Sequence, residues 1–238
     1  MKPNEVTINE AVSPAMKANE TRANEPDEKI RKTMMALERN NIIPYYAESA
    51  AKAAEIAMSL VAEGSTISCG GSVTLVESGI LAKMRSSKYK FLDRAIKGLT
   101  AEEVEELQRK TFFADAFFTS SNAVTENGEL YNVDGNANRI AAIAYGPKKV
   151  IVVVGENKIV ENLEEAQRRV KCVAAPLNAT RLHTETPCER FGKCIAAEGT
   201  MAEGCRSERR MCCQYLTTAY QRQKGRIIVI ITPTSLGY

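Results

Sequence analysis

Two uninterrupted apolar runs restrict what this chain can fold into more than any other feature of its sequence. One is "KKVIVVVG", which ends at Gly155, and the other is "GRIIVIIT", which ends at Thr232. Their β-branched residues favour strands, and a strand with one face in water would alternate apolar and polar side chains. Both runs therefore predict strands buried on both faces, in a sheet that helices cover on each side.

Amphipathic segments alternate with strands along the chain. Helical spacing of apolar side chains, together with capping residues, predicts helices over 27–40, 49–63, 73–84, 138–146, 162–177 and 207–223, and one that starts at Thr100. Shorter runs predict further strands at "STISC", "KYKFLD", "AFFTS" and "ELYNVDG". Such alternation is typical of βαβ units, so the expected fold class is α/β, with a mainly parallel sheet flanked by helices.

The domain organisation is expected to be simple. Residues 1–26 carry three prolines among polar residues without an apolar period, which predicts a tail. No internal repeat and no long linker follows. Residues 27–238 are therefore expected to form one domain with an N-terminal helical appendage, and this domain includes a cysteine-containing segment at 183–213.

Composition and missing motifs exclude several function classes. The net charge of +3 is too small to argue for nucleic acid, and no basic block has interleaved aromatic residues. The sequence contains no run of about 18 apolar residues, so no segment is expected to span a membrane. No secretory signal is visible, so a cytoplasmic protein with reduced thiols is expected. Neither the dinucleotide glycine fingerprint nor a Walker A motif occurs, so neither NAD nor ATP is expected.

A glycine turn links the strand at "STISC" to the helix that follows it. Its order is Cys69, Gly70, Gly71 and Ser72. Glycines let a ligand approach the backbone closely, and a helix start favours an anion such as phosphate or carboxylate. The alternative is a plain tight turn in which Ser72 caps the helix. A nucleophilic role for Cys69 is weighed against a small buried residue at a strand end, and the second is preferred.

Polar side chains also crowd residues 119–139, between two apolar strands. Asn127 and Gly128 are assigned to a hairpin turn. The other polar residues predict the lining of a pocket, in a cleft shared with the glycine turn, because ligands bind at the carboxyl ends of parallel strands. The residues expected to bind the ligand are Gly70, Gly71, Ser72, Ser121, Asn122, Asp134, Gly135, Asn136 and Arg139.

Arg139 opens a predicted helix, where its positive charge opposes the helix dipole. Such a placement requires a compensating partner, either Asp134 or an anionic ligand. The salt bridge to Asp134 is slightly favoured.

The pieces "CGGSVTLVESG" and "ADAFFTSSNAVTENGELYNVDGNANRIAAIAYGPKKVIVVVGENKIV" resemble the lactate-utilisation (LUD) domain family. The resemblance implies a Rossmann-like fold of the NagB/RpiA/CoA-transferase-like group. It also implies a part in the oxidation of lactate to pyruvate, in systems that contain several iron–sulfur proteins.

CoA-transferases of similar fold use a glutamate nucleophile, for which Glu126 and Glu77 are the candidates here. A cap, a salt bridge or a solvated charge is the preferred interpretation of each.

Four late cysteines, Cys188, Cys194, Cys205 and Cys212, are separated by five, ten and six residues. Four thiolates gathered at one point would bind zinc or an iron–sulfur cluster. The run "TPCERFGKC" is similar to a cysteine series in relatives of the family, but "IAAEGTMAEG" here separates the second cysteine from the third. The family's redox setting and the lack of a C-x-x-C pair favour an iron–sulfur cluster over zinc. Metal-free reduced cysteines and disulfides are the alternatives.

His183 is the one histidine of the chain, and a surface or packing role is expected for it rather than metal ligation or catalysis.

The expected function is a component of lactate or 2-hydroxy acid utilisation that binds a small anionic metabolite. Iron–sulfur redox proteins of the same pathway are the expected partners, a homo-oligomer is compatible with the sequence, and neither nucleic acid nor membrane is expected. The alternatives are a CoA-transferase-like or sugar-phosphate-handling enzyme and a non-enzymatic ligand sensor.

Overall fold

The structure, a computed structural model, describes residues 25–238. The tail predicted for residues 1–26 lies, apart from its last two residues, outside the described part. The helices are α2 (Glu28–Arg39), α3 (Ala50–Ser59), α4 (Val73–Glu77), α5 (Ile80–Met84), α6 (Ala101–Lys110), α7 (Asn138–Ala144), α8 (Leu163–Arg169), α9 (Ala175–Leu182) and α10 (Pro187–Phe191). A π-helical turn (Val170–Ala174) joins α8 to α9, and 3-10 turns cover Thr111–Phe113 and Glu156–Lys158.

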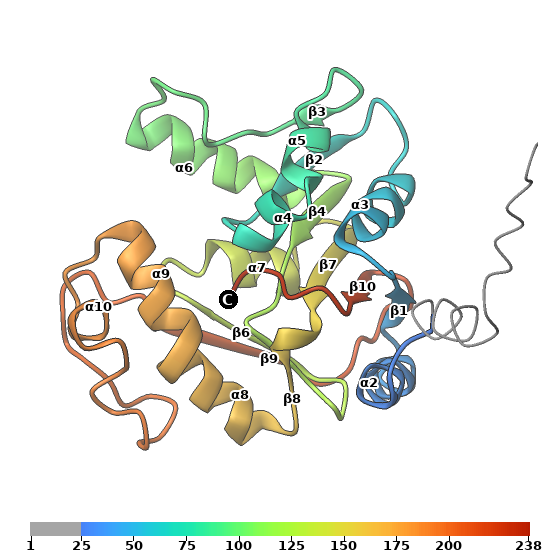
Figure 1. The fold of residues 1–238 in the computed structure, drawn as a ribbon. Coiled ribbons are helices and arrows are strands. Elements are labelled where there is room, and N and C mark those ends of the chain that lie inside the picture. The colour runs from blue at the N-terminus through green and yellow to red at the C-terminus, as the bar shows by residue number, and fades with distance from the viewer. Residues whose placement is uncertain (1–24) are drawn as a thin grey trace, which may run out of the picture.

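The strands form two sheets. They are β1 (Ile43–Tyr46), β2 (Thr66–Cys69), β3 (Lys90–Phe91), β4 (Ala116–Thr119), β5 (Ala123–Thr125), β6 (Leu130–Asp134), β7 (Lys149–Gly155), β8 (Ile159–Val160), β9 (Gln214–Thr218) and β10 (Ile227–Thr232). The larger, six-stranded sheet has the order β1-β10-β7-β4-β2-β3, and all its neighbouring strands are parallel. This confirms the predicted α/β class, and the two apolar strands, β7 and β10, are neighbours in the middle of the sheet (Figure 1).

The smaller, four-stranded sheet has the order β8-β5-β6-β9. The hairpin β5–β6 is antiparallel, with Asn127 and Gly128 in its turn as predicted, and β9 adds antiparallel to β6. Strand β6 and its hairpin turn were predicted, but the pairing of β5, β8 and β9 into a second sheet was not, because these strands are short and mixed in composition.

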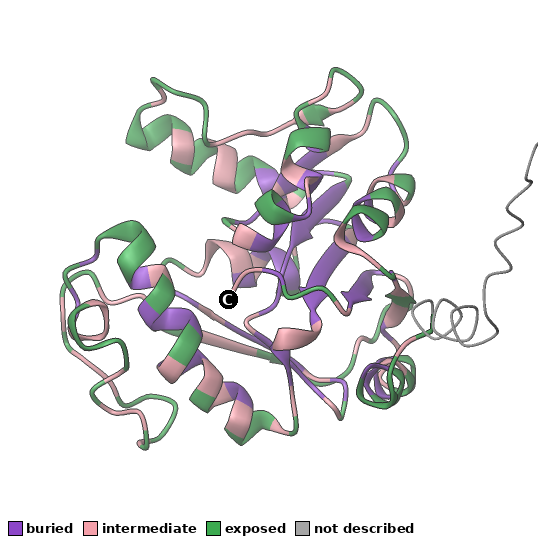
Figure 2. Cartoon of the chain, viewed as in Figure 1, coloured by how far each residue is buried: buried purple, intermediate pink, exposed green. Residues whose placement is uncertain are grey.

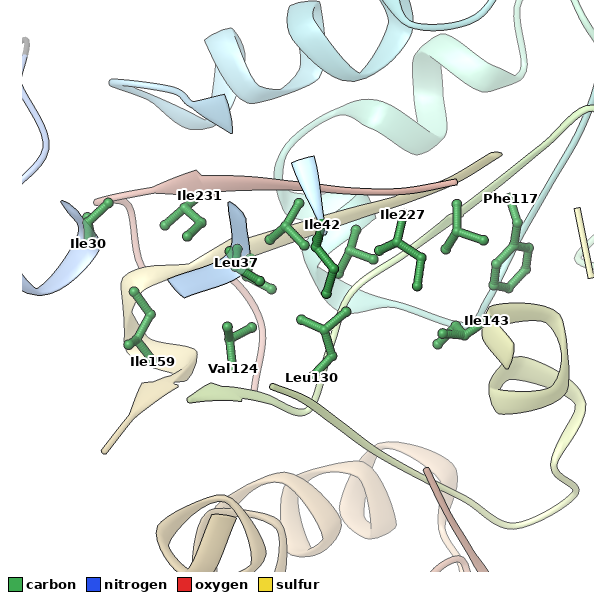
Figure 3. Packing of buried hydrophobic residues seen from close by; sticks show 14 of the residues in the cluster. Ile30, Leu37, Ile42, Phe117, Val124, Leu130, Ile143, Ile159, Ile227 and Ile231 are labelled. Carbon is green, nitrogen blue, oxygen red and sulfur yellow. The ribbon is translucent and has the colours of Figure 1, made fainter. Parts of the chain in front are cut away.

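The core lies between successive layers of helices and sheets. Alternate side chains of β7 point to opposite faces of the large sheet: Val152 packs toward the small sheet, α2 and α7, and Val153 toward α3, α4 and α5. A third cluster, which includes Tyr131, lies between the small sheet and α8–α9. The strands of the large sheet are thus covered on both faces, as Figure 2 shows by burial and Figure 3 by the packing of the first cluster.

Local chemistry accounts for most helix starts. Ser72 accepts a hydrogen bond from the amide of Leu75, so it caps α4 as predicted. Thr100 and Glu103 form the predicted capping box of α6.

None of the helices in the described range 25–238 is long and apolar enough to cross a membrane.

Four predicted helices were wrong in extent or type. The helix predicted over 162–177 consists of α8, the π-helical turn and α9, and it continues to Leu182. The helix predicted over 73–84 is divided into α4 and α5 at Gly79, whose φ is +77°. The helix predicted over 49–63 ends at Ser59, and Gly64 lies in the turn beyond it. Residues 207–223, predicted as helix, instead hold a loop and strand β9.

Tertiary pairing explains the error at β9. Leu216 packs in the first core cluster and Tyr215 in the third, on the opposite face of the small sheet. Their alternation is that of a strand, and pairing with β6 supplies the backbone hydrogen bonds. A helical period in the sequence was therefore overridden by an available sheet edge.

The close approach of the β5–β6 turn to helix α2 gives a stability prediction. Gly128 has a φ of +82°, and a Cβ there would lie 2.6 Å from the carbonyl carbon of Ala36 and 2.7 Å from the amide nitrogen of Leu37. Gly64 has a similar φ of +83° but nothing within 4 Å of its Cβ position. We expect Gly128→Ala to lower the free energy of unfolding by about 2–4 kcal/mol and Gly64→Ala by about 1 kcal/mol. Urea unfolding measures both, and equal losses would contradict the packing argument.

Candidate functional site

A cleft opens at the carboxyl edge of the large parallel sheet. Its volume is about 680 Å³, and loops that follow β2, β4 and β7 line one side. Helix α9 and residues 208–212 line the other, and the C-terminal Tyr238 lies between the two sides (Figure 1). The glycine turn and the segment 119–139 therefore share one cleft, as predicted.

All but one of the residues predicted to bind a ligand line this cleft. The exception is Gly70, whose amide donates to the carbonyl oxygen of Phe118 at 3.1 Å. A Cβ on Gly70 would lie 3.0 Å from Cδ of Arg139. Gly70 therefore lies behind the cleft and makes room for Arg139. Those that line it are Gly71, Ser72, Ser121, Asn122, Asp134, Gly135, Asn136 and Arg139.

Arg139 holds the cleft loops together. Its Nε donates to a carboxylate oxygen of Asp134 at 2.8 Å, so the predicted salt bridge is present. The other carboxylate oxygen of Asp134 accepts from the amide of Ile140 and so caps α7. The four remaining N–H groups of Arg139 have four acceptors: the carbonyls of Ser120 and Val133 and the side-chain oxygens of Asn122 and Asn132. Arg139 is thus saturated by the protein.

Two other predicted residues are also occupied internally. The hydroxyl of Ser121 shares its one proton between the carbonyl oxygens of Ala123, at 2.7 Å, and Tyr131, at 3.2 Å. Asn122 accepts from the amide of Val133 in addition to Arg139. These side chains shape the cleft wall, whereas Asn136 is exposed and has no hydrogen bond within residues 25–238.

Lys158 is the cleft residue that the sequence analysis missed. It follows β7 at the same carboxyl edge, and it is 2% exposed. Its Nζ donates to Oγ1 of Thr74 at 2.8 Å and to Oγ of Ser120 at 3.0 Å, and it makes no ion pair in the described part of the chain. Its position in "GENKIV", directly after a buried strand, could have indicated a place in the cleft, because ligands bind at the carboxyl ends of parallel strands.

The surroundings of Lys158 are cationic. Burial lowers its pKa to about 7, and repulsion from Arg169 and Arg139 adds to the effect, while Glu77 opposes it. Arg169 is itself held by two carbonyl oxygens, those of Asn157 and Asn122, and burial lowers its pKa as well. The floor of the cleft therefore carries more positive than negative charge.

Arg94 extends this positive surface to the mouth of the cleft. It lines the cleft, and its Nη2 lies 2.9 Å from the position that a Cβ on Gly71 would take. Within residues 25–238 its guanidinium donates no hydrogen bond to another side chain or backbone group. Gly71 thus leaves space for a guanidinium that is available to a ligand.

The two candidate glutamates lie outside the cleft lining. Glu77 accepts a hydrogen bond from the amide of Gly237 at 2.6 Å, which ties down the C-terminal segment. Glu126 forms an ion pair with Lys32 of α2 at 2.6 Å. Both therefore have structural partners, in line with the preferred interpretation of each.

The four late cysteines line one small apolar pocket of about 30 Å³ beside the cleft. Burial raises the pKa of Cys212 to about 12, and the neighbouring Cys188 and Cys194 raise it further. The pocket also contains the hydroxyl of Tyr131, which is buried without a hydrogen-bond partner. As placed here, no three His, Cys, Asp or Glu side chains of the described residues could hold a metal ion.

The remaining candidates have simpler environments. Burial raises the pKa of Cys69 to about 11, which disfavours the nucleophilic thiolate. The side chain of His183 is 86% exposed, which agrees with a surface role.

Comparison with curated proteins found no significant match. Among solved structures, the chain is similar to a DUF162 family protein from Deinococcus radiodurans, with a TM-score of 0.47 and 17% identity, over 86% of this chain and 96% of that one. It is also similar to a ribose 5-phosphate isomerase A from Methanocaldococcus jannaschii, with a TM-score of 0.32 and 15% identity, over 68% and 76%. A D-ribose-5-phosphate isomerase in complex with phospho-erythronic acid gives a TM-score of 0.35 and 14% identity, over 81% and 79%.

The LUD domain model matches residues 30–232, which include both sheets and all residues that line the cleft except the C-terminal Tyr238. The match confirms the resemblance that the glycine turn and the segment 114–160 indicated. This chain belongs to the LUD domain family.

Proposed function

We propose that this protein takes part in lactate or 2-hydroxy acid utilisation by binding a small organic anion, the hydroxy acid or the corresponding oxo acid, in the cleft. Family membership relates the chain to lactate utilisation. The observation that carries the proposal is the buried Lys158 at the cleft wall, which has hydroxyl partners but no carboxylate partner.

Electrostatics support an anionic ligand. A buried cation without a counter-ion is unfavourable, so an anion placed beside it favours the charged form of the lysine. Arg139 is neutralised by Asp134, whereas Lys158 and Arg169 have no ion pair within residues 25–238. Arg94 at the mouth offers planar, paired donors of the kind that suit a carboxylate.

The cleft also offers neutral groups suited to a hydroxy acid. Asn136 and Asn138 both line it, and their amides can donate to or accept from a hydroxyl. In this arrangement Arg94 holds the carboxylate, and Lys158 lies beside the hydroxyl or oxo group of the acid. Iron–sulfur redox proteins of the same pathway are the partners that such a role requires.

The first binding prediction concerns Arg94. We expect Arg94→Gln to weaken binding of L-lactate or pyruvate about 10- to 100-fold, because a charged hydrogen bond contributes about 1.5–3 kcal/mol. Isothermal titration calorimetry measures this change. Arg109→Gln is the matched control, since Arg109 lies on α6 away from the cleft with its side chain 77% exposed, and we expect an affinity within about twofold of wild type.

Other ligands distinguish the alternatives. If neither L-lactate nor pyruvate binds, but ribose 5-phosphate does, the sugar-phosphate alternative replaces this proposal. An acyl adduct on a glutamate after incubation with acetyl-CoA would favour the transferase. Tight binding without turnover in the presence of the redox partners would favour a sensor.

A metal or iron–sulfur cluster in the cysteine pocket is the second part of the proposal. Cys188, Cys194, Cys205 and Cys212 would hold it, with the four side chains moving together from their present positions. The orphan hydroxyl of Tyr131 supports this assignment, because a buried hydroxyl without a partner can donate to a metal-bound thiolate or sulfide. An iron–sulfur cluster there would carry electrons, whereas zinc would stabilise the fold of the cysteine-containing loops that line the pocket.

We expect Cys194→Ser to lose bound metal, because the substitution removes one of four thiolates. Metal analysis and the visible absorption spectrum of protein purified without oxygen measure the loss. Cys213→Ser is the control, since Cys213 is exposed and lies outside the pocket, and its metal content should equal that of wild type. Equal metal content in wild type and Cys194→Ser would exclude the cysteine site.

A further inference from the structure

Two buried lysines of this chain differ in how their nitrogen atoms are satisfied. Lys171, 5% exposed, donates to three carbonyl oxygens, those of Ala196, Gly199 and Thr200, at 2.6–3.0 Å. Three acceptors match the three N–H groups of an ammonium, so Lys171 is a structural cation. Lys158, also buried, has two acceptors and lines the cleft.

The partners of Lys158 both accept from it. The hydroxyl of Thr74 donates to the carbonyl oxygen of Leu236 at 3.2 Å, and that of Ser120 to the carbonyl of Ser121 at 3.4 Å. Each hydroxyl has one proton, so neither can also donate to the lysine. A neutral amine has two N–H groups, and both are then used. Its lone pair points away from these two bonds.

From this geometry we infer that Lys158 forms an imine with the carbonyl carbon of a 2-oxo acid bound in the cleft. The inference deepens the proposed function, on which it rests: it identifies the oxo acid, rather than the hydroxy acid, as the species that reacts with the protein. Lysine amines placed in apolar surroundings next to other cations are activated nucleophiles for carbonyl compounds.

The reaction needs no oxidant and no cofactor. The lone pair of Nζ forms a C–N bond to the carbonyl carbon as the C=O π bond breaks, and one proton passes from that nitrogen to the oxygen to give a neutral carbinolamine. The carbinolamine then loses its hydroxyl group and one N–H proton as water. The sum is amine plus ketone to imine plus water.

The charges around Lys158 favour its amine form. Burial disfavours the ammonium form of Lys158, and the positive charges of Arg169 and Arg139 act in the same direction. Glu77 is the one acidic group that opposes them. The pKa of Lys158 therefore falls to about 7. At neutral pH the amine fraction is then larger than that of an ordinary lysine by roughly a thousandfold. The carboxylate of the oxo acid would meanwhile remain beside Arg94.

Reductive trapping tests the inference. The full-length protein is incubated with pyruvate and sodium cyanoborohydride, digested, and mapped by mass spectrometry. We expect Lys158 to carry a carboxyethyl group at a level at least about tenfold above that of Lys171 or the exposed Lys52. Lactate, which has a hydroxyl in place of the keto group, should give no label. Lys158→Arg keeps the positive charge and should remove the label.

The pH dependence supplies a second readout on the wild-type protein. Labelling of Lys158 should rise through a pH of about 7 and then level off, because the amine form is already complete. An ordinary lysine would continue to rise toward about 10.5. If labelling of Lys158 instead continued to rise toward a pH of about 10.5, the inference would be wrong.

The outcomes separate the imine from the binding proposal. If calorimetry detects pyruvate binding but Lys158 carries no more label than Lys52, the imine is wrong and the anion site stands. If neither pyruvate nor lactate binds, both proposals fail. Label at Lys158 that disappears in Lys158→Arg supports both.

Discussion

The parallel pairing of β7 with β10 is the constraint on which the rest of the structure depends. Both strands are apolar on both faces, so one face must be covered by α3–α5 and the other by the small sheet with α2 and α7. Burial of each Val or Ile side chain stabilises the fold by about 1.5–3 kcal/mol, and this pair contributes much of the core. With both faces closed, the carboxyl ends of the strands are where loops can gather polar groups, and the cleft lies there.

Arg139 converts that arrangement into a defined site. A single guanidinium connects the loop after β4, strand β6 and the start of α7, and Gly70 of the turn after β2 packs beneath it. Its saturation means that it positions the cleft wall, whereas Lys158 and Arg94, whose nitrogens are not neutralised by a carboxylate, line the cleft itself. The distinction between a satisfied and an unsatisfied cation, rather than the number of basic residues, is what gives the cleft its chemical character.

The sequence predicted those features that depend on local pattern. The β-branched runs predicted the central strands, and the cap at Ser72 and the turn at Gly128 were also found from residue type alone. Strand β9 and the role of Lys158 were not, for a common reason. Each depends on what lies opposite it in space: β9 on the free edge of β6, and Lys158 on Thr74, 84 residues away along the chain. A lysine after a strand looks solvated until the groups that bury it are known.

The cleft and the cysteine pocket share a wall, which bears on how the two could work together. Val170 and Ala175 at the turn between α8 and α9 line both, as do Arg210, Met211 and Cys212 of the loop before β9. Arg210 holds this loop through the carbonyls of Cys205 and Cys212. A group bound by the cysteines would therefore fix the same loop that closes one side of the cleft. Residues 210–212 would therefore relate the occupancy of the pocket to the shape of the cleft, because close-packed interiors transmit displacements.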